Sequence, residues 1–516
     1  MKQKITYLLL ALFTGVLSAQ TVNIQGDPYG GNPYGSIAEA IIASVNDTDV
    51  ILITGLHTLT GESISIAKSI TLRGTDPTTD IIEAAASASS DGTGSRVIYL
   101  DGNNGTPITP LYITIENLGI RHGNANASSN GGGIFSDKIT GLVTLKNLIV
   151  ENNYTGKNGG GLAFDGSNAN IVECTIRNNT STTDGGGIII APNNGAAINC
   201  TINIQQSLLD SNTGRNGGGI WINGANASSY TVNLNIENST ISNNSTTSGS
   251  AGNGGGAILS TSPSNVTLKL VHATVYNNTH AGDIKAGLRF LNASTNFSAY
   301  NSIIVGTSDD ALAKKAISFT NTNTTDIINC ILGGLDAVGD GSPGTPAAII
   351  DDAAKNNLKG RKATESGLDI ASGLQSLGGS TQVYAILDKS GFGFNTANDY
   401  CTASTGLTLP TVDQRGYTRA ETYDAGAYEL GGTLSIGDVV FKNSSVRIFP
   451  NPAREFVQIS GLQNIKVVRV YSVIGALEKV VYNQKELNVS NLSKGLHFVT
   501  IEDDNNNIAT KRLIVK

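Results

Sequence analysis

The chain has 516 residues and a formal net charge of −7, and 61 of its residues are glycine. This length exceeds that of one ordinary domain unless the domain is a repeat array that grows along one axis. Hydrophobic residues still make up 39% of the chain, which excludes a disordered low-complexity protein and favours ordered repeats.

The N-terminal residues 1–19 are expected to be a cleavable signal peptide. Lys2 and Lys4 precede an apolar run, and small residues at Ser18 and Ala19 mark a cleavage point. The apolar run is too short for a comfortable membrane span, and no other stretch approaches the required length. We therefore expect a chain that leaves the cytoplasm and has no transmembrane segment.

A short amphipathic helix is predicted over 36–43, with Ser36 as its cap, and strands are predicted over 50–53 and 69–74. The first coil of a solenoid exposes an edge that can pair with other chains. We expect the helix to cover that edge.

The dominant pattern is an internal repeat. A Gly-Gly-Gly triplet, led by Asn or Asp and followed by an aliphatic stretch, occurs five times, and a degenerate sixth copy lies at Ala286-Gly287. The period of about thirty residues corresponds to one coil of three short strands. Glycine triplets allow positive φ at a corner and let coils stack closely. The triplets lie at 131–133, 159–161, 185–187, 217–219 and 254–256.

A second element between the triplets ends in paired asparagines, as in the segments 148–153 and 174–179. Equivalent asparagines on successive coils would lie about 4.8 Å apart and can hydrogen-bond as a ladder. The sequence therefore predicts an all-β protein whose main domain, over 20–430, is a right-handed parallel β-helix.

The same register explains the cysteines. One column contains Ser, Ala and Leu residues together with Cys174 and Cys330, so the cysteines replace small residues there. Those two stand several coils apart, too far for a disulfide, and Cys200 has no obvious partner. With Cys401 they show no C-x-x-C spacing. We expect no metal and no cofactor.

Downstream of the repeats lies a segment dense in charge. It reads Asp-Gln-Arg-Gly at 413–416, then Arg419, then Asp-Ala-Gly-Ala-Tyr-Glu at 424–429. This resembles the closing signature of bacterial β-helix proteins of the choice-of-anchor Q group, which are pectin-lyase-like; Ala425 stands where that pattern has Ile. Buried charges must be paired, so we expect an ion network that shields the last coil rather than a catalytic site.

After a linker over 431–445 a separate domain is predicted over 446–516, where ten Lys and Arg stand against six Asp and Glu. Short alternating apolar strands, split by turns rich in Gly and Asn, indicate a small Ig-like β-sandwich. Pro450 and Pro452 fix a rigid start that cannot join a central strand.

Four motifs of this domain, in their order along the chain, resemble the type A sorting domain of the type IX secretion system of Bacteroidota. The sequence departs from that family near His497, where the family commonly has Tyr. The resemblance implies that the type IX machinery is a partner and that the protein is secreted or held at the outer cell surface, via the periplasm. In that family the domain is usually removed, and the passenger is joined to surface lipopolysaccharide or released. The motif residues are Pro450, Asn451, Pro452, Gly475, Gly495 and Lys511.

No catalytic residue is assigned. Lyases of this fold need a base and usually a carboxylate cluster that holds calcium, and hydrolases need two carboxylates at a set separation. The Asp pairs at 309–310 and 351–352 are expected in solvated turns, and His122 at a coil corner. The candidate bases are scattered over several coils: Lys138, Lys157, Arg177, Arg215, Lys285 and Arg289.

One exposed face gives a better indication of function. If the aliphatic residue after each triplet points inward, the next one points outward. An outward stripe with Trp221, the only tryptophan, suits stacking on a sugar ring or contact with another protein. The alternative, a lateral loop that covers the stripe, stays open. The predicted binding residues are Phe135, Ile189, Trp221, Leu259 and Arg289.

Two functions follow as hypotheses. The first is a non-enzymatic, adhesin-like surface protein that binds a polysaccharide or another surface protein through the stripe. The second is a polysaccharide lyase or glycoside hydrolase with an unrecognised active site. We expect no nucleic-acid partner.

Overall fold

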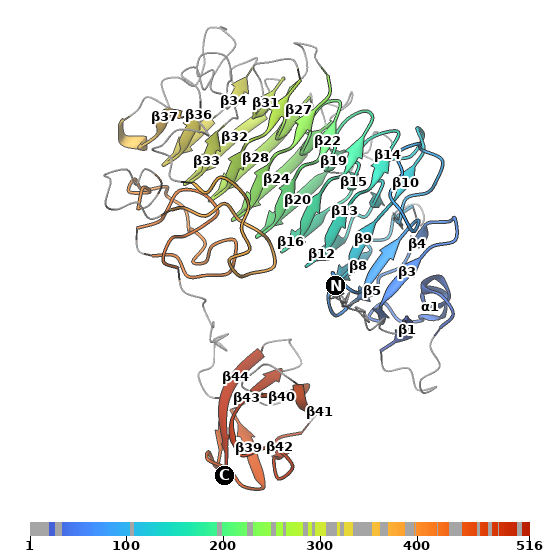
Figure 1. Cartoon of the computed structure of the whole chain (residues 1–516), viewed down its shortest axis with the longest axis vertical. Coiled ribbons are helices and arrows are strands. Elements are labelled where there is room, and N and C mark those ends of the chain that lie inside the picture. Colours follow the sequence, from blue (N-terminus) through green and yellow to red (C-terminus); the bar gives the residue numbers. More distant parts are fainter. Residues whose placement is uncertain are drawn as a thin grey trace, which may run out of the picture. The chain divides into compact units, whose positions relative to one another are not determined.

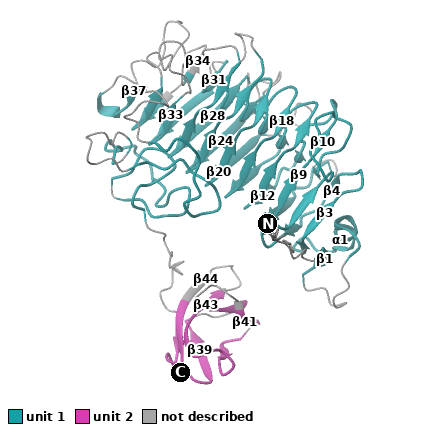
Figure 2. Ribbon diagram, in the orientation of Figure 1, with its two compact units in different colours: residues 1–432 teal, residues 433–516 magenta. Residues whose placement is uncertain are grey.

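The computed structural model divides the chain into two compact units, residues 1–432 and 433–516 (Figures 1 and 2). The predicted signal peptide over 1–19 lies outside the described residues, as does most of the predicted linker. The structure describes residues 20–25, 34–103, 108–192, 199–223, 231–248, 254–261, 265–281, 287–291, 295–305, 317–319, 325–333, 353–361, 370–387, 397, 399–420, 422–432, 446–461, 465–472, 477–482, 484–502 and 508–516.

Three long parallel sheets, here called sheets A, B and C, form the first unit, and each coil adds one short strand to each sheet (Figure 1). Neighbouring strands pair in register: Leu145 pairs with Ile115 of the preceding coil and Ile171 of the next. The predicted all-β class, with a parallel β-helix as the main domain, is confirmed.

Sheet A contains β2 (Val50–Thr54), β5 (Thr71–Arg73), β8 (Tyr112–Glu116), β12 (Leu142–Lys146), β16 (Ala169–Val172), β20 (Cys200–Gln205), β24 (Thr231–Glu237), β28 (Asn265–Val271), β32 (Thr295–Tyr300) and β35 (Thr325–Ile328). Sheet B contains β3 (Leu56–Thr58), β6 (Ile81–Glu83), β9 (Gly119–Arg121), β13 (Ile149–Glu151), β17 (Thr175–Arg177), β21 (Leu208–Asp210), β25 (Thr240–Ser242), β29 (Thr274–Tyr276), β33 (Ile303–Val305), β36 (Ile331–Gly333) and β37 (Leu358–Arg361).

Sheet C contains β4 (Ile64–Ile66), β7 (Ile98–Asp101), β11 (Ile134–Asp137), β15 (Leu162–Asp165), β19 (Ile188–Ala191), β23 (Ile220–Ile222), β27 (Ile258–Ser260), β31 (Leu288–Phe290) and β34 (Ile317–Phe319). Between sheets B and C a narrow corner sheet contains the two-residue strands β10 (Asn124–Ala125), β14 (Tyr154–Thr155), β18 (Thr180–Ser181), β22 (Thr213–Gly214), β26 (Ser245–Thr246) and β30 (Thr279–His280).

The N-terminal end of the stack is covered as the sequence predicts. Helix α1 (Ile37–Ala43) begins after Ser36, whose hydroxyl accepts a hydrogen bond of 3.1 Å from the Glu39 N–H. Ile37 and Ile41 are buried, and the helix contacts β2, β4 and β1 (Thr21–Ile24), which pairs antiparallel with β2.

Alternation along each strand places apolar side chains inside the coil. In β24 every second residue, Val232, Leu234 and Ile236, is buried. Each stacks on its register partner in the next coil, so one continuous core extends through the unit. Burial of this kind contributes about 25 cal/mol per Å² of apolar surface.

The predicted asparagine ladder is confirmed, and it lies inside the protein. The Asn179 side-chain amide donates to Asn212 Oδ1 at 3.0 Å and to the Val150 carbonyl at 2.9 Å. The Asn179 backbone N–H also donates to Asn212 Oδ1, at 3.0 Å. The same pattern repeats from coil to coil along the buried residues Asn153, Asn179, Asn212, Asn244 and Asn278.

The glycine corners stack as expected. Gly159 has φ of +73°, and a Cβ placed at Gly160 would lie 2.5 Å from the Gly186 carbonyl oxygen of the next coil. In the fifth copy the corner is shifted by one residue. Gly255 there has the positive φ, and Ala257 stands where the other corners have their third glycine.

The predicted cysteine column is also confirmed. The Cys174 backbone N–H donates to the Ser207 hydroxyl at 3.1 Å, and that of Ala273 donates to the Ser302 hydroxyl at 3.0 Å. All four cysteines are buried and free. Burial raises the pKa of the Cys174 and Cys330 thiols to about 12, which disfavours the reactive thiolate form.

The described residues of the segment 370–432, here called the closing arm, lie along the side of the stack. Gln414 accepts a hydrogen bond from the Thr240 hydroxyl at 2.6 Å, and the Ala427 N–H donates to the Thr274 hydroxyl at 2.9 Å. The charged segment 413–429 therefore lies against interior coils, so the expectation that its ion network shields the last coil was wrong. Another part of the arm does reach the last described coil, where the Tyr400 hydroxyl donates to the Asn356 carbonyl at 2.7 Å. The outer face of sheet B is apolar in these coils, and Tyr276, Ile303 and Ile331 pack into a shared cluster with the arm.

The expected ion network is present within the arm. Arg415 pairs with Asp413 at 2.7 Å and Arg419 pairs with Glu429 at 2.9 Å, all with buried side chains. The Arg415 guanidinium also lies between the rings of Tyr417 and Tyr428, 4.1 and 3.9 Å from their centres. Pairing of this kind offsets the desolvation of the buried charges.

The second unit has two antiparallel sheets, which fit the predicted Ig-like sandwich. Val457 and Leu513 lie in its buried core. Asn451 fixes the start of the unit to its last strand, since its side chain donates to the Arg512 carbonyl at 2.6 Å and accepts from the Ile514 N–H at 2.9 Å. The sheets contain β38 (Arg447–Phe449), β39 (Phe456–Ser460) and β42 (Glu486–Asn488), and β41 (Leu477–Tyr482), β40 (Val467–Ser472), β43 (Gly495–Glu502) and β44 (Ile508–Val515).

We predict that Asn212→Ala lowers the free energy of unfolding of the β-helix by roughly 2–4 kcal/mol, because it removes the buried oxygen that accepts from both the backbone N–H and the side-chain amide of Asn179. Asn203→Ala is the matched control: Asn203 belongs to a half-exposed ladder on sheet A, where it donates to Asn170 at 2.9 Å, and water can replace its bonds. Denaturant unfolding checks this, and equal losses in the two variants would contradict a special role of the buried ladder.

Asp424 gives a prediction about pH. Burial raises its pKa from 3.8 to about 7, so between these values the folded protein holds a proton that the unfolded chain has lost. This contribution to stability is present at low pH and is lost as pH rises towards 7. Thermal unfolding from about pH 4 to about pH 8 should show Asp424→Asn gaining stability relative to the wild type as pH rises; a constant difference would refute this.

Candidate functional site

The predicted stripe forms one column on the outer side of sheet C. In register order, Phe135 pairs with Ala163, which pairs with Ile189, and Ile189 pairs with Trp221. Trp221 pairs with Leu259 and Leu259 with Arg289. The alternation of the strands therefore places these residues as the sequence predicts.

The expected exposure was wrong for three of them. Ile189 is 3% exposed, Leu259 1% and Arg289 3%. One cause is the glycine corner, which folds back over the column: a Cβ at Gly159 would lie 2.7 Å from Ile189 Cγ2, and one at Gly255 would lie 2.9 Å from Leu259 Cβ. These positions present little side-chain surface to a ligand.

Phe135 and Trp221 are half-buried, so part of each ring meets solvent. The Trp221 indole N–H donates to the Thr261 hydroxyl at 3.0 Å, which fixes the ring from the following coil.

At the N-terminal end of the column the Phe135 ring stacks on Tyr99, with ring centres 5.5 Å apart and planes inclined by 16°. The Arg96 guanidinium lies 4.8 Å from the centre of Phe135 and 5.3 Å from that of Tyr99. Sequence reasoning missed Tyr99 because its coil has no glycine triplet. The only signal was the alternation of Ile98, Tyr99 and Leu100, in which Tyr99 is the outward residue and pairs with Phe135.

Three carboxylates line the next outward position of the same strands. Asp101, Asp137 and Asp165 are register partners on successive coils, and all are half-buried. The Tyr99 hydroxyl lies 3.4 Å from Asp137 Oδ2. Burial raises the pKa of Asp137, and burial together with the nearby carboxylates raises the pKa of Tyr99.

These six residues are here called the aromatic–acidic patch. The patch combines partly exposed ring surface with carboxylates that can accept hydrogen bonds from hydroxyl groups. Its members are Arg96, Tyr99, Asp101, Phe135, Asp137 and Asp165.

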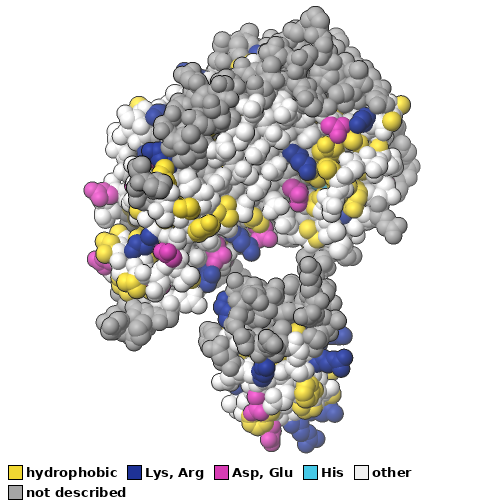
Figure 3. Space-filling model, turned by 180° about the vertical axis from the view of Figure 1, so that it is seen from behind, with side chains coloured by type: hydrophobic (Ala, Val, Ile, Leu, Met, Phe, Trp, Pro, Cys, Tyr) yellow, Lys and Arg dark blue, Asp and Glu magenta, His cyan; other side chains and the backbone are white. Residues whose placement is uncertain are grey.

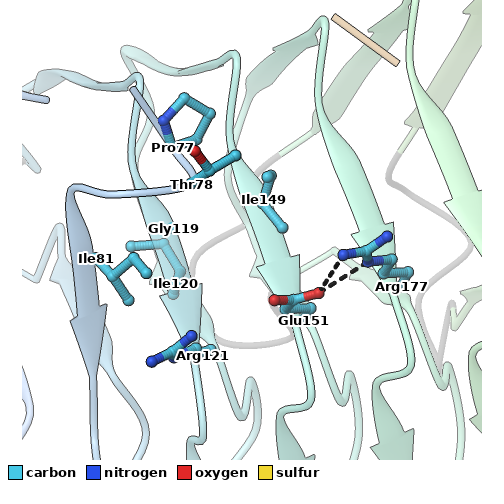
Figure 4. Close-up of a pocket in the computed structure, with 9 residues that line it drawn as sticks. All are labelled: Pro77, Thr78, Ile81, Gly119, Ile120, Arg121, Ile149, Glu151 and Arg177. Atoms are coloured by element: carbon cyan, nitrogen blue, oxygen red, sulfur yellow. Dashed lines mark hydrogen bonds and ion pairs between the residues drawn. The ribbon is translucent and has the colours of Figure 1, made fainter. Parts of the chain in front are cut away.

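A second surface, on sheet B, has a cavity of about 140 Å³ (Figure 4). Its charged residues belong to a column of alternating sign in which Arg177 pairs with Glu151, and Arg121 with Glu83, each at 2.8 Å. The floor between them is formed by Ile81, Gly119 and Ile149. The two charges of each pair neutralise each other, which fits a structural role on the sheet surface.

The candidate bases do not gather into one site. Arg177 is paired with Glu151, and Arg215 lies 3.6 Å from Asp184 on another sheet corner. His122 has φ of +59° and occupies a coil corner, as expected. The Asp pairs at 309–310 and 351–352 and Lys285 lie outside the described residues. In the part of the chain that the structure describes, no group of His, Cys, Asp or Glu could hold a metal ion.

In the second unit, Gly495 begins β43 with φ of +135°, and Lys511 lies half-buried in β44. Gly475 lies outside the described residues. His497 is 1% exposed, and its ring nitrogens lie 2.6 Å from Glu478 Oε2 and 2.7 Å from the Ser493 carbonyl. This histidine therefore stands in the interior with two acceptors.

Residues 447–516 match the family model of the secretion system C-terminal sorting domain. No curated protein and no solved structure matches the chain. The protein is secreted to the cell surface or the extracellular space. The sorting domain makes the type IX secretion machinery a partner of the chain, and none of the helices among the described residues is long and apolar enough to cross a bilayer.

Proposed function

We propose that the β-helix is a non-enzymatic glycan-binding module of this exported protein and that the aromatic–acidic patch is its binding site. The stack of Tyr99 on Phe135 beside in-register carboxylates supports this most directly. A sugar ring has an apolar face, which packs well on an aromatic ring. It also has a rim of hydroxyl groups, which can donate hydrogen bonds to carboxylates.

The charge of the patch favours neutral glycans over uronate-rich ones. The patch has the three carboxylates of Asp101, Asp137 and Asp165, and among the described residues the nearby cations are only two, Arg96 and Lys138, so negative charge is in excess. An anionic sugar would be brought next to half-buried carboxylates, where like charges interact more strongly than in water.

The column extends the site along the helix axis. Trp221 lies three coils from Phe135, a distance of about 14 Å at the usual strand spacing, and its ring is partly exposed. A polymeric glycan that follows the axis would meet both rings. This reading keeps Phe135 and Trp221 as binding residues and treats the buried Ile189, Leu259 and Arg289 as support for the column.

One observation favours the alternative, a glycoside hydrolase. Asp137 and Asp165 lie on adjacent paired strands, and strand spacing brings such carboxylates close to the separation of about 5 Å used by retaining enzymes. The choice-of-anchor and pectin-lyase-like resemblance remains a prediction that fits either function.

We predict that Phe135→Ala and Tyr99→Ala each weaken binding of a neutral polysaccharide by about tenfold, because each removes half of the ring stack. Calorimetric titration of the chain from residue 20 onward, over neutral and uronate-rich glycans, measures this. Tyr112→Ala is the matched control, since Tyr112 is 64% exposed and lies on sheet A. Unchanged affinity in both ring variants would remove the patch as the site.

The same samples decide the catalytic alternative. We expect no release of reducing ends and no unsaturated products during prolonged incubation. Turnover that disappears in Asp137→Asn would refute the binding-only function and would assign the carboxylates to chemistry.

A further inference from the structure

The sorting domain has a surface groove whose floor is apolar and whose charged residues are all cations. The groove has a volume of about 900 Å³ and is lined by Ile448, Leu496 and Ile514 together with Arg447, Lys511 and Arg512. No carboxylate occurs among the described residues that line it. Figure 3 shows Lys and Arg side chains beside apolar ones on this unit.

The exposed apolar residues follow from the strand register. Leu513 and Val515 of β44 point into the core, so Arg512 and Ile514 point outward. Ile514 pairs with Leu496 of β43, and these side chains are 44% and 39% exposed. This outward apolar pair forms part of the lining of the groove.

One side of the groove is an edge strand. Among the described residues, β38 pairs only with β39 and ends its sheet. The end of β44, by contrast, is already bonded by Asn451 and by Ala453, whose N–H donates to the Ile514 carbonyl at 2.8 Å. An edge such as β38 offers backbone groups to an added strand.

We propose that this groove is the surface by which the sorting domain docks onto the export machinery, and that its occupant is an extended protein segment in which apolar residues alternate with Asp or Glu. Pairing with β38 would place alternate side chains over the Leu496–Ile514 floor, and the carboxylates would meet the guanidinium and ammonium groups of the rim. An anionic lipid would match the rim and the floor but would leave the backbone edge of β38 unused. The inference deepens the sorting role of this domain and does not depend on glycan binding by the β-helix.

Export of the full chain in its own host tests the groove. We expect Ile514→Glu and Leu496→Glu to reduce the amount at the surface and in the medium by about tenfold, with accumulation in the periplasm, because each places a negative charge where the acidic segment docks. Phe456→Glu is the matched control: Phe456 is also 44% exposed and lies on β39, outside the groove. Normal export of folded Ile514→Glu would overturn the proposal.

Arg512→Gln distinguishes loss of docking from loss of folding, since it removes a rim charge at an exposed position and keeps the apolar floor. It should reduce export while leaving the melting temperature unchanged. Unchanged export of this variant and of Arg447→Gln, which removes the other exposed rim charge, would overturn the charged part of the proposal.

A binding experiment separates a protein occupant from a lipid one. The full chain should bind a short fluorescent peptide of alternating valine and glutamate, more weakly as salt rises, and should not bind its valine–lysine counterpart. Arg512→Gln should weaken this binding. Binding to phosphatidylglycerol vesicles but not to the peptide, or equal binding of both peptides, would refute the proposed occupant.

Discussion

In-register pairing of successive coils is the constraint on which the whole β-helix depends. A slip of one residue would turn the apolar ladder of Val232, Leu234 and Ile236 towards solvent. The buried asparagines prevent such a slip, because the Asn212 side chain accepts two hydrogen bonds from the coil before it and donates one to the coil after it. In a low-dielectric interior an unpaired amide is costly, so the register with every amide paired is strongly preferred.

This register also determines the chemistry of the surface, because it aligns the equivalent outward residues of successive coils in columns. On sheet B the register places opposite charges side by side, and the resulting ion pairs, such as Arg121 with Glu83, neutralise each other. On sheet A it builds an outward amide ladder, in which Asn203 donates to Asn170 and Asn235 donates to Asn203. On sheet C it places the rings of Tyr99 and Phe135 together and sets carboxylates beside them. The proposed binding site thus lies where the repeat departs from its own consensus.

The parts that sequence reasoning predicted are those set by local periodicity. Glycine triplets and paired asparagines specify the coil length, the corner conformation and the side to which each strand residue points. The columns of register partners and the buried asparagine ladder could therefore be predicted. Exposure did not follow, because the burial of Ile189 depends on how the corner at Gly159 folds back, which spacing alone does not encode. Tyr99 was missed because its coil lacks a triplet. The position of the closing arm depends on contacts far apart in the chain, such as that of Gln414 with Thr240.

The closing arm helps to explain why the glycan site is proposed on sheet C. An outer sheet face that is apolar must be covered, and the arm covers sheet B where Tyr276, Ile303 and Ile331 point outward. The outward amides on sheet A bond to one another, so a ligand would have to compete with those bonds. Sheet C keeps partly exposed rings at Phe135 and Trp221, at outward positions whose side chains lie outside the core. Recognition there can therefore change by substitution of a few outward residues, while the inward residues and the asparagine ladder preserve the fold.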